Sequence, residues 1–316
     1  MDFQLTALQE ELRDTTRKLC AGRFPISASR AADGRVDGAA WAELAEAGVF
    51  NLRQAEDDGG LGLGTTDAAV VLEELGRGLV PGPLVWSHLA AGTLAPGVVG
   101  GVERPVAGEP ILVEHLVDLD ALVVLDADGV WSVDPGRLDG RPLAPLDPLT
   151  PVWGVDALPQ GSRVGSGELA ARWRLEGAAL TAAQLAGVAA GVCELTVAYA
   201  KERRQFGRPV GSFQAVKHAL ADMLVRAEMA RVQAYAAAAH LDEPGLADTA
   251  RAVAAAKLVA GDAALQNGKA AIQLHGGMGM TWEVDAHLYL KRAWVLDASF
   301  GTGDVQAEVI AARVVR

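Results

Sequence analysis

The second half of the chain constrains the fold most strongly, because it is rich in alanine and its apolar residues recur at helical spacing from Leu180 to the end. Candidate helices run over residues 181–203, 213–241, 246–274, 283–298 and 304–315. Alanine-rich faces let helices approach closely, and helices of these lengths suit a bundle of long, roughly antiparallel helices. We therefore expect residues 171–316 to form a C-terminal helical bundle.

Residues 1–97 are expected to form a second, N-terminal helical domain. Thr6 followed by Gln9 fits a capping box at the start of a helix, and Asp37 is placed to cap another. The glycine-rich run at residues 57–64 predicts a loop. A further helix is expected from Thr66 until Pro81-Gly82-Pro83 stops it.

Residues 98–170 differ from both flanking regions, since proline and glycine are frequent and short apolar runs replace helical periodicity. Residues 121–125 and 130–133, separated by Asp128-Gly129, predict a β-hairpin, and residues 111–113 predict a further strand. The sequence thus indicates a mainly α protein with a small, reduced β domain in the middle.

Composition and charge narrow the class of protein. Half of the 316 residues are hydrophobic and 22% are charged, which is typical of a globular chain. The net charge of −12 argues against nucleic acid as the main partner, although local basic residues can still bind phosphate. The N-terminus lacks a signal-peptide pattern, and we expect no stretch apolar enough to span a bilayer. A soluble cytoplasmic protein is the expectation.

A cationic cluster ends the first long helix of the bundle, in the run Lys201-Glu202-Arg203-Arg204-Gln205-Phe206-Gly207-Arg208-Pro209. One interpretation is structural, because basic residues stabilise the C-terminal end of a helix dipole. It leaves the Phe-Gly-Arg-Pro turn and the following helix with Gln214 unexplained. The other interpretation is functional, because the guanidinium of Arg203 can pair bidentately with a pyrophosphate. The residues alone leave both open.

A second candidate site lies at Gln273-Leu274-His275-Gly276-Gly277-Met278-Gly279. These glycines could simply end a helix. Alternatively, Gly276 and Gly277 let the backbone approach a ligand closely while Gln273 hydrogen-bonds it. This run is not a dinucleotide fingerprint, because no strand precedes it and the glycine spacing differs. The six histidines show no metal-ligand spacing, and no Gly-x-Ser-x-Gly elbow is present.

Together these segments resemble the acyl-CoA dehydrogenase family, and the resemblance covers nearly the whole chain. In the N-terminal part it rests on WAELAEAGVFNLRQAEDDGGLGLG and VVLEELGRGLVPGP. In the C-terminal half it rests on AYAKERRQFGRPVGSFQAVKHALADM and AIQLHGGMGMTWEVDAHLYLKRA, whose order, separation and intervening helical pattern all agree. The resemblance implies an N-terminal helical domain, a middle β-barrel and a C-terminal four-helix bundle.

The resemblance also implies a FAD cofactor, which the bundle of one subunit reaches in its neighbour. It implies these contacts to the FAD tail: Arg203 at the pyrophosphate, with Gln205, Phe206 and Gln214 nearby, and Gln273, Gly276 and Gly277 along the adenosine-pyrophosphate portion. The expected partners are an acyl-CoA substrate, other subunits of an oligomer, and electron-transfer flavoprotein or a similar electron acceptor.

The chain departs from the family pattern at the catalytic base. In the family a glutamate abstracts the α-proton of an acyl-CoA thioester while hydride leaves Cβ for the flavin. Aligned on Gly301 and Thr302, this chain has Phe300 where relatives have that glutamate. Relatives with the base on an earlier helix have it where this chain has Gly177. Glu176 is adjacent, but a one-residue slip turns a helical side chain by about 100°. The catalytic residue therefore stays unassigned.

The β region departs from the family as well. No Thr-Glu-Pro…Gly-Ser-Asp stretch occurs between residues 94 and 124, and this region is shorter than in relatives. The chain thus keeps the parts that grip the FAD tail and lacks those that hold the reactive ring. This pairing is similar to actinobacterial α2β2 acyl-CoA dehydrogenases, in which one subunit holds the ring and base and the other donates its bundle. We hypothesise that the chain is the shorter, non-catalytic partner of a paralogous subunit.

Two alternatives remain at this stage. The first is a self-sufficient homotetrameric dehydrogenase or flavin oxidase, with Glu176 or another carboxylate as base. The second is a scaffold protein that kept the fold and lost flavin. The retention of Arg203, Gln214 and Gln273 argues against the scaffold, which has no evident need for them.

Overall fold

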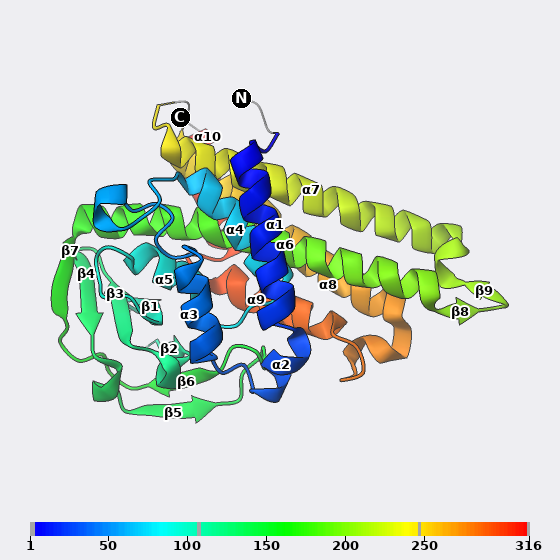
Figure 1. The fold of residues 1–316 in the computed structure, drawn as a ribbon, viewed down its shortest axis with the longest axis horizontal. Helices are drawn as coiled ribbons and strands as arrows, with labels where there is room; N and C mark the ends of the chain where they lie inside the picture. The colour runs from blue at the N-terminus through cyan, green and yellow to red at the C-terminus, as the bar shows by residue number, and fades with distance from the viewer. Residues whose placement is uncertain (1–3, 106–108, 246–247, 315–316) are drawn as a thin grey trace.

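The computed structural model describes residues 4–105, 109–245 and 248–314. Along the chain it contains a group of N-terminal helices, a small β region and a long helical bundle (Figure 1). Strands β1 to β7 lie at one end of the molecule, and the bundle extends away from them to the small hairpin of β8 (Arg204–Gln205) and β9 (Arg208–Pro209) (Figure 1). The predicted fold class is confirmed.

The N-terminal part contains α1 (Ala7–Arg23), α2 (Ile26–Ala31), α3 (Gly38–Glu46), α4 (Thr65–Arg77) and α5 (Leu84–Ala90). Both predicted caps form: the Thr6 hydroxyl accepts from Gln9 N at 3.3 Å, and the Asp37 carboxylate accepts from the first amides of α3. The sequence missed α2 and α5, which are six and seven residues long and show too little periodicity to be detected. Each has a proline as its N-cap residue, outside the helix.

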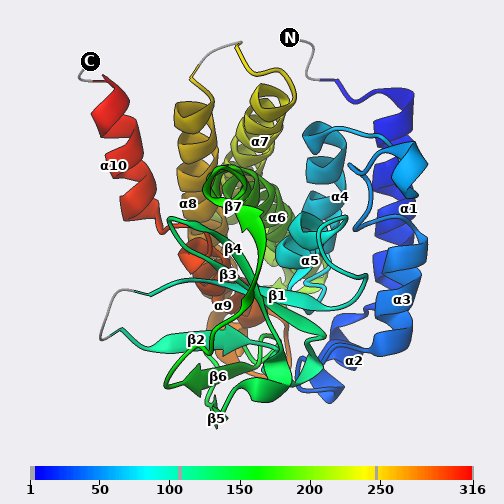
Figure 2. The same cartoon turned by 90° about the vertical axis from the view of Figure 1, so that its left-hand side faces the viewer.

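The β region consists of two sheets. The first has the order β1-β3-β4-β7 and the second β2-β6-β5, with β1 (Val99–Glu103), β2 (Ile111–Glu114), β3 (Ala121–Leu125), β4 (Gly129–Val133), β5 (Gly140–Leu143), β6 (Val152–Val155) and β7 (Ser162–Ser166). The predicted hairpin is confirmed, since β3 and β4 pair antiparallel with Leu125 opposite Val130. Figure 2 shows β2, β5 and β6 at the bottom of the view and β7 in front of α6. The strands that the sequence missed are short and rich in glycine and proline.

The bundle is built from α6 (Gly167–Glu202), α7 (Gln214–Asp242), α8 (Thr249–His275), α9 (Ala286–Ala298) and α10 (Gly303–Val314). Four of these helices begin and end close to the predicted positions. The exception is α6, which was predicted to begin at residue 181 and begins at Gly167, where the Ser166 hydroxyl caps it. Its first turns bury Ala170 and Trp173, so tertiary packing stabilises a stretch whose glycines and charges weaken the helical signal.

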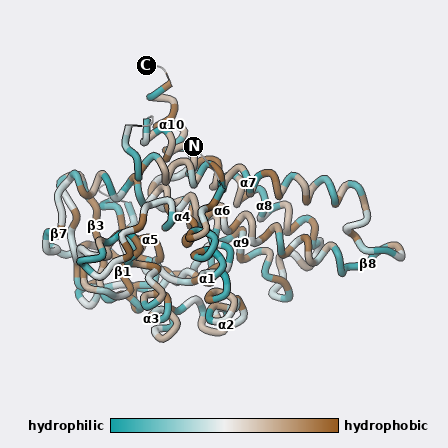
Figure 3. Tube along the Cα trace, turned by 45° about the horizontal axis from the view of Figure 1, so that its top comes forward, coloured by the Kyte–Doolittle hydropathy of each residue, from teal (hydrophilic) through white to brown (hydrophobic). Residues whose placement is uncertain are grey.

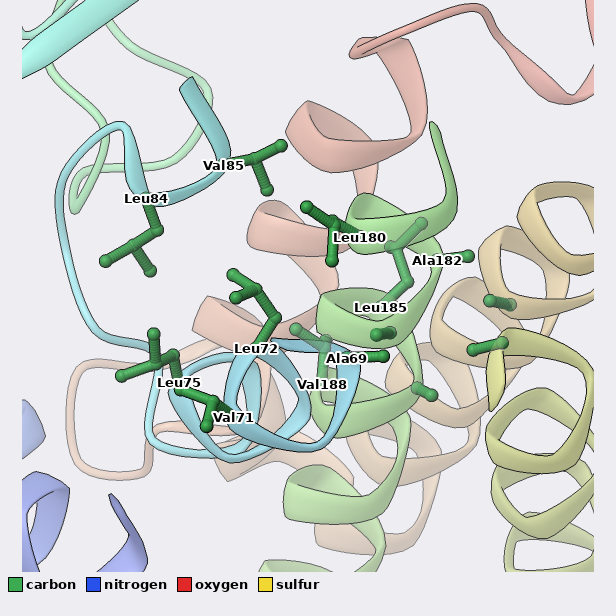
Figure 4. Close-up of a cluster of buried hydrophobic side chains, with 14 of the residues drawn as sticks. Ala69, Val71, Leu72, Leu75, Leu84, Val85, Leu180, Ala182, Leu185 and Val188 are labelled. Carbon is green, nitrogen blue, oxygen red and sulfur yellow. The ribbon is translucent and has the colours of Figure 1, made fainter. Parts of the chain in front are cut away.

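Close contact between α4 and α6 forms the centre of the core. Figure 4 shows Leu72 of α4 facing Leu180 of α6. The side chains of Leu72, Leu75, Leu180, Leu185 and Val188 are all fully buried. Glycine is needed where the backbones meet: a Cβ on Gly187 would lie 1.8 Å from the Glu73 carbonyl oxygen. In Figure 3 apolar segments gather where α4, α5 and the strands meet. This core holds α6 in place. Glu176 and Gly177 lie in the first half of this helix, and Arg203 lies at its C-terminal end.

Helix α6 also corrects one expectation. By length and composition it is apolar enough to cross a bilayer, although the sequence had indicated no such stretch. Of its most apolar window, 89% is buried inside the protein, because α4, α7, α8 and α9 surround it. The central helix of a folded core meets the same criteria as a membrane span.

Candidate functional site

The far end of the bundle carries the first predicted site. Helix α6 ends at Glu202, Arg203 occupies its C-cap, and β8 (Arg204–Gln205) turns into β9 (Arg208–Pro209). Phe206 and Gly207 form the turn with φ of +54° and +79°, and Phe206 is 92% exposed. Gln214 is the exposed first residue of α7. The predicted residues therefore share one solvent-facing end of the molecule (Figure 1).

Two exposed arginines lie at this end of the bundle. Within the described part of the chain, the guanidinium groups of Arg203 and Arg204 form no ion pair, and both side chains are exposed. Arg208 instead stacks on Phe213, with its guanidinium carbon 4.1 Å from the ring centroid. Unpaired cations stand out in a chain of net charge −12, where most other arginines have carboxylate partners. Such a cluster can bind a polyanion such as a pyrophosphate.

The second predicted segment lies at the same end of the bundle. Gln273 is exposed in the last turn of α8, and Gly276 leaves the helix with φ of +63°. A Cβ added at Gly276 or Gly277 would meet no atom within 4 Å, so the backbone there is open to a ligand. The ring of Tyr199, near the end of α6, stacks on His275 with centroids 4.1 Å apart. This stacking brings the ends of α6 and α8 together.

The position expected for the catalytic glutamate is packed with aromatic rings. Phe300 is 8% exposed, and its ring centroid lies 4.5 Å from that of Trp86 on α5. Against its other side lies Gly177, where a Cβ would come within 2.3 Å of the Phe300 ring. Two cavities border Phe300 and Trp86, with volumes of about 30 Å³ and about 260 Å³. The two alternative positions for the base, 177 and 300, are thus in direct contact. The Phe300 ring occupies the space that a side chain at position 177 would need.

A buried lysine holds the loop that carries Phe300. The Lys257 ammonium donates to the carbonyls of Asp297 at 2.9 Å and Gly301 at 3.3 Å, and its side chain is fully buried. Gln306 adds a hydrogen bond to the Phe300 carbonyl at 2.9 Å. Burial lowers the pKa of Lys257 to about 8, against the opposing attraction of the Asp297 carboxylate. No sequence pattern pointed to this role, because a lysine in a helical pattern is usually a surface residue.

Glu176, the alternative base, is fixed in a structural ion pair. Its carboxylate accepts from Arg53 Nη2 at 2.9 Å and from Arg172 Nε at 2.6 Å. Burial by itself raises the pKa of Glu176, but the hydrogen bonds and charges of the two arginines outweigh it and lower the pKa. Arg53 also donates to His88 Nε2 at 3.0 Å. A carboxylate held ionised by two cations is a weak proton acceptor.

Glu114 is a site residue that the sequence analysis missed. It ends β2 and lines both the 30 Å³ cavity beside Phe300 and a neighbouring cavity of about 260 Å³. Among the described residues its carboxylate has no hydrogen bond or ion pair, and burial raises its pKa. An unpartnered carboxyl group with a raised pKa in a cavity is a candidate proton acceptor. Its sequence context, a short strand in a region without clear motifs, gave no signal.

Comparisons with known proteins agree with this architecture. The family models for the acyl-CoA dehydrogenase N-terminal domain and C-terminal domain match residues 6–98 and 165–315. Acyl-CoA dehydrogenase IpdE2 of Mycobacterium tuberculosis strain H37Rv is 36% identical over 301 aligned residues, covering 90% of each protein. The chain belongs to the acyl-CoA dehydrogenase family. This is a family of flavoprotein oxidoreductases of lipid metabolism, so the predicted family is confirmed and the expected FAD cofactor agrees with it.

Two further proteins are similar to the chain, one in sequence and one in fold. FadE34 of the same organism is 36% identical, and the alignment covers 91% of this chain but 45% of FadE34. The chain therefore spans about half the length of that relative. The structure of the ChsE4–ChsE5 complex from Mycobacterium tuberculosis shares the fold, with a TM-score of 0.88 and 24% identity over 100% of this chain and 99% of that chain. The roles of the individual FAD-tail residues stay predictions.

Proposed function

We propose that the chain is the subunit of a FAD-dependent acyl-CoA dehydrogenase that lacks the catalytic base and donates its bundle end to the FAD of a paralogous partner. The packing at Phe300 carries this proposal. A base must reach the α-carbon of a bound thioester, and a general base acts within about 3 Å of the proton it removes. At this position stands an aromatic ring, which cannot accept a proton, wedged between Trp86 and Gly177.

The ion pairs of Glu176 also support the absence of a catalytic base in this chain. Its carboxylate would have to leave two arginines, Arg53 and Arg172, before it could accept a proton. Because the Arg53 pair is buried, separating it costs several kcal/mol, about 3–5 in comparable proteins. The neighbouring residue Gly177, which faces Phe300, carries no functional group.

The residues at the end of the bundle support the second part of the proposal, binding of the FAD tail. Arg203 has an exposed guanidinium without an ion pair, which suits bidentate pairing with a pyrophosphate. Gln214 and Gln273 are exposed nearby for hydrogen bonds to the adenosine portion, and Gly276 and Gly277 leave room for close approach. These features fit the tail of FAD. They account for the retention of this end in a chain that has phenylalanine at the position of the catalytic glutamate.

In the proposed complex the reaction is the α,β-desaturation of an acyl-CoA thioester. FAD, when bound, takes up the hydride that leaves Cβ, and the partner subunit supplies the base that takes the α-proton. The residues of this chain bind and orient the FAD tail, which fixes the cofactor for the reaction. Electron-transfer flavoprotein or a similar acceptor would remove the electrons, and a cytoplasmic location remains a prediction.

Similarity to FadE34 and to the ChsE4–ChsE5 complex is consistent with a chain that works beside a second, related unit. The match to less than half of FadE34 leaves room in that protein for a second unit of similar size. The ChsE4–ChsE5 complex joins two differently named components and shares the fold of this chain.

The test is to co-express the chain with the paralogous subunit encoded by the neighbouring gene and to measure the flavin content of the purified complex. The Arg203→Ala variant is compared with wild type. Loss of most FAD is expected for Arg203→Ala, whereas Arg141→Ala, an exposed arginine on β5 at the other end of the molecule, should keep it. Unchanged flavin in Arg203→Ala would contradict the FAD-tail role. One FAD per chain and dehydrogenase activity in the chain purified alone would contradict the absence of a base.

Glu114 favours a second candidate function, a self-sufficient homo-oligomeric dehydrogenase. Its carboxyl group, without a hydrogen bond or ion pair among the described residues, lines both cavities that border Trp86 and Phe300. If the chain alone desaturates an acyl-CoA, Glu114→Gln should abolish that activity while Glu176→Gln should not. If the chain alone is inactive and the complex with its partner is active, Glu114→Gln in the complex should leave the rate unchanged.

A further inference from the structure

The two cavities that border Trp86 and Phe300 share the carboxyl group of Glu114 in their linings. Glu114 is half-buried, and among the described residues its carboxyl group forms no hydrogen bond or ion pair. The buried acidic side chains of the described chain are each paired with an arginine instead: Glu73, Glu74, Asp147 and Glu176. Glu114 is therefore the exception, and a carboxylate in such a place calls for a cation.

Gln184 of α6 is a second polar group without a partner, and it lines the smaller cavity of about 30 Å³. This residue is 3% exposed, and its side-chain amide forms no hydrogen bond among the described residues. The polar atoms of Gln184 and Glu114 keep some accessible surface, so a ligand can reach them. Arg292 lines the same cavity, but its guanidinium is already bound to Asp147 and to two backbone carbonyls. The smaller cavity thus offers a carboxylate and an amide oxygen to a donor group about the size of one water molecule.

The larger cavity, of about 260 Å³, supplies apolar walls and no positive charge. Its described lining contains Val102, Ile111 and Leu112 and no lysine, arginine or histidine. Glu103 adds a second carboxylate, which pairs with Arg174 outside the lining. A cavity of about 150 Å³ can hold benzene, so this one has room for a small ring or a short aliphatic chain. An anion in this cavity would face two carboxyl groups and no lining cation.

We propose that these two cavities together bind a small organic ammonium ion. Its N–H groups donate to Glu114 and Gln184, and its apolar body packs on Ile111 and Leu112. An ammonium group has three donors and no acceptor, which suits two acceptors better than the single donor of a hydroxyl group. It also supplies the positive charge that Glu114 lacks, and charge-assisted hydrogen bonds are about twice as strong as neutral ones. This inference is independent of the proposed FAD-tail role, because it uses no residue at the end of the bundle. It assigns Glu114 to ligand binding instead of proton removal.

The test is a titration of the full chain with benzylamine, followed by tryptophan fluorescence because Trp86 borders both cavities. Benzyl alcohol is the neutral analogue of this probe, and phenylacetate is the anionic one. We expect saturable binding of benzylamine at one site per chain, with both analogues weaker by at least about tenfold. No saturation up to about 10 mM, or equal binding of benzyl alcohol, would overturn the proposal. Tighter binding of phenylacetate would also overturn it, because Glu114 would then act as a protonated donor.

The pH dependence of binding gives a second readout. Burial raises the pKa of Glu114; the nearby charges of His115 and Arg292 lower this pKa in part, and that of Asp147 raises it further. Below this pKa the carboxyl group must release a proton when the ammonium ion binds. The affinity for benzylamine should therefore fall by up to about tenfold per pH unit as the pH is lowered through this range, where an alkylammonium group stays charged. The same pH dependence in wild type and Glu114→Gln would overturn the proposed pairing.

Matched variants locate the bound probe. Glu114→Gln keeps the shape of the side chain and removes its charge, so it should weaken benzylamine binding by at least about tenfold. Glu168→Gln, at an exposed position of α6 that lines neither cavity, should leave binding unchanged. Ala298→Phe places a ring at the wall of the larger cavity and should abolish binding, whereas Ala39→Phe, at an exposed position of α3, should not. Unchanged binding in Glu114→Gln and Ala298→Phe would overturn the assignment. The flavin content of the complex is a separate measurement, so either proposal can fail without the other.

Discussion

Replacing Arg53 with methionine should destabilise the protein by about 3 kcal/mol, the low end of the range for breaking a buried ion pair. The substitution keeps most of the side-chain volume but removes the Nη2 contact at 2.9 Å to Glu176, whose side chain is 5% exposed. Losing one partner of a buried pair costs about 3–5 kcal/mol, because the other charge is left uncompensated. Arg172 remains, but its side chain is 68% exposed, so it offsets at most about 1 kcal/mol. His88 also loses the hydrogen bond to its Nε2.

The measurement is urea unfolding at neutral pH, with the change in free energy taken from the midpoint at constant m-value. Arg104→Met is the matched control, because Arg104 pairs with Asp126 at the surface with a side chain 46% exposed. That variant should lose less than about 1 kcal/mol. In a double-mutant cycle, Arg53→Met and Glu176→Gln should couple by about 2 kcal/mol, since the second substitution removes the charge that the first leaves unpaired.

The dependence on pH gives a further check on the same pair. The pKa of Glu176 is lowered in the folded protein, so the unfolded chain binds the proton more readily. The stabilisation is therefore present above the unfolded pKa, near 4.3, and is lost as the pH falls through the folded pKa. The difference between wild type and Arg53→Met should shrink in that acidic range. A loss in Arg53→Met no larger than in Arg104→Met would refute the reasoning.

Two other substitutions test the region around Phe300. Because burial lowers the pKa of Lys257 from 10.5 to about 8, the unfolded chain binds one more proton between these pH values, and Lys257 makes stability rise with pH there. Lys257→Met should lack this rise, worth up to about 3 kcal/mol, in urea midpoints measured across that range; parallel pH profiles would contradict the pKa. Gly177→Ala should destabilise the protein by about 1–3 kcal/mol, because its Cβ would meet the Phe300 ring at 2.3 Å. In a Phe300→Ala background the same change should be nearly neutral by thermal unfolding, and an equal loss in both backgrounds would place the strain elsewhere.

The features that the sequence determined are those encoded within a few neighbouring residues. The capping box at Thr6, the cap at Asp37 and the β3–β4 hairpin each depend on local hydrogen bonds or a turn, and all three are present. Helical periodicity likewise placed α7 and α9 within a few residues. The motifs around Arg203 and Gln273 were specific enough to identify the family.

The tertiary structure alone decided what each candidate side chain touches. Phe300 and Gly177 are 123 residues apart in the chain, and their direct contact depends on the packing of α6 against the loop after α9. Glu176 and Arg53 are equally distant in sequence, so no local pattern indicated that the candidate base is held in an ion pair. Glu114 became a candidate only when β2 placed it beside Phe300. A sequence pattern records which groups are present, whereas proton transfer and ligand binding depend on distances of a few ångströms that the packing of distant segments sets.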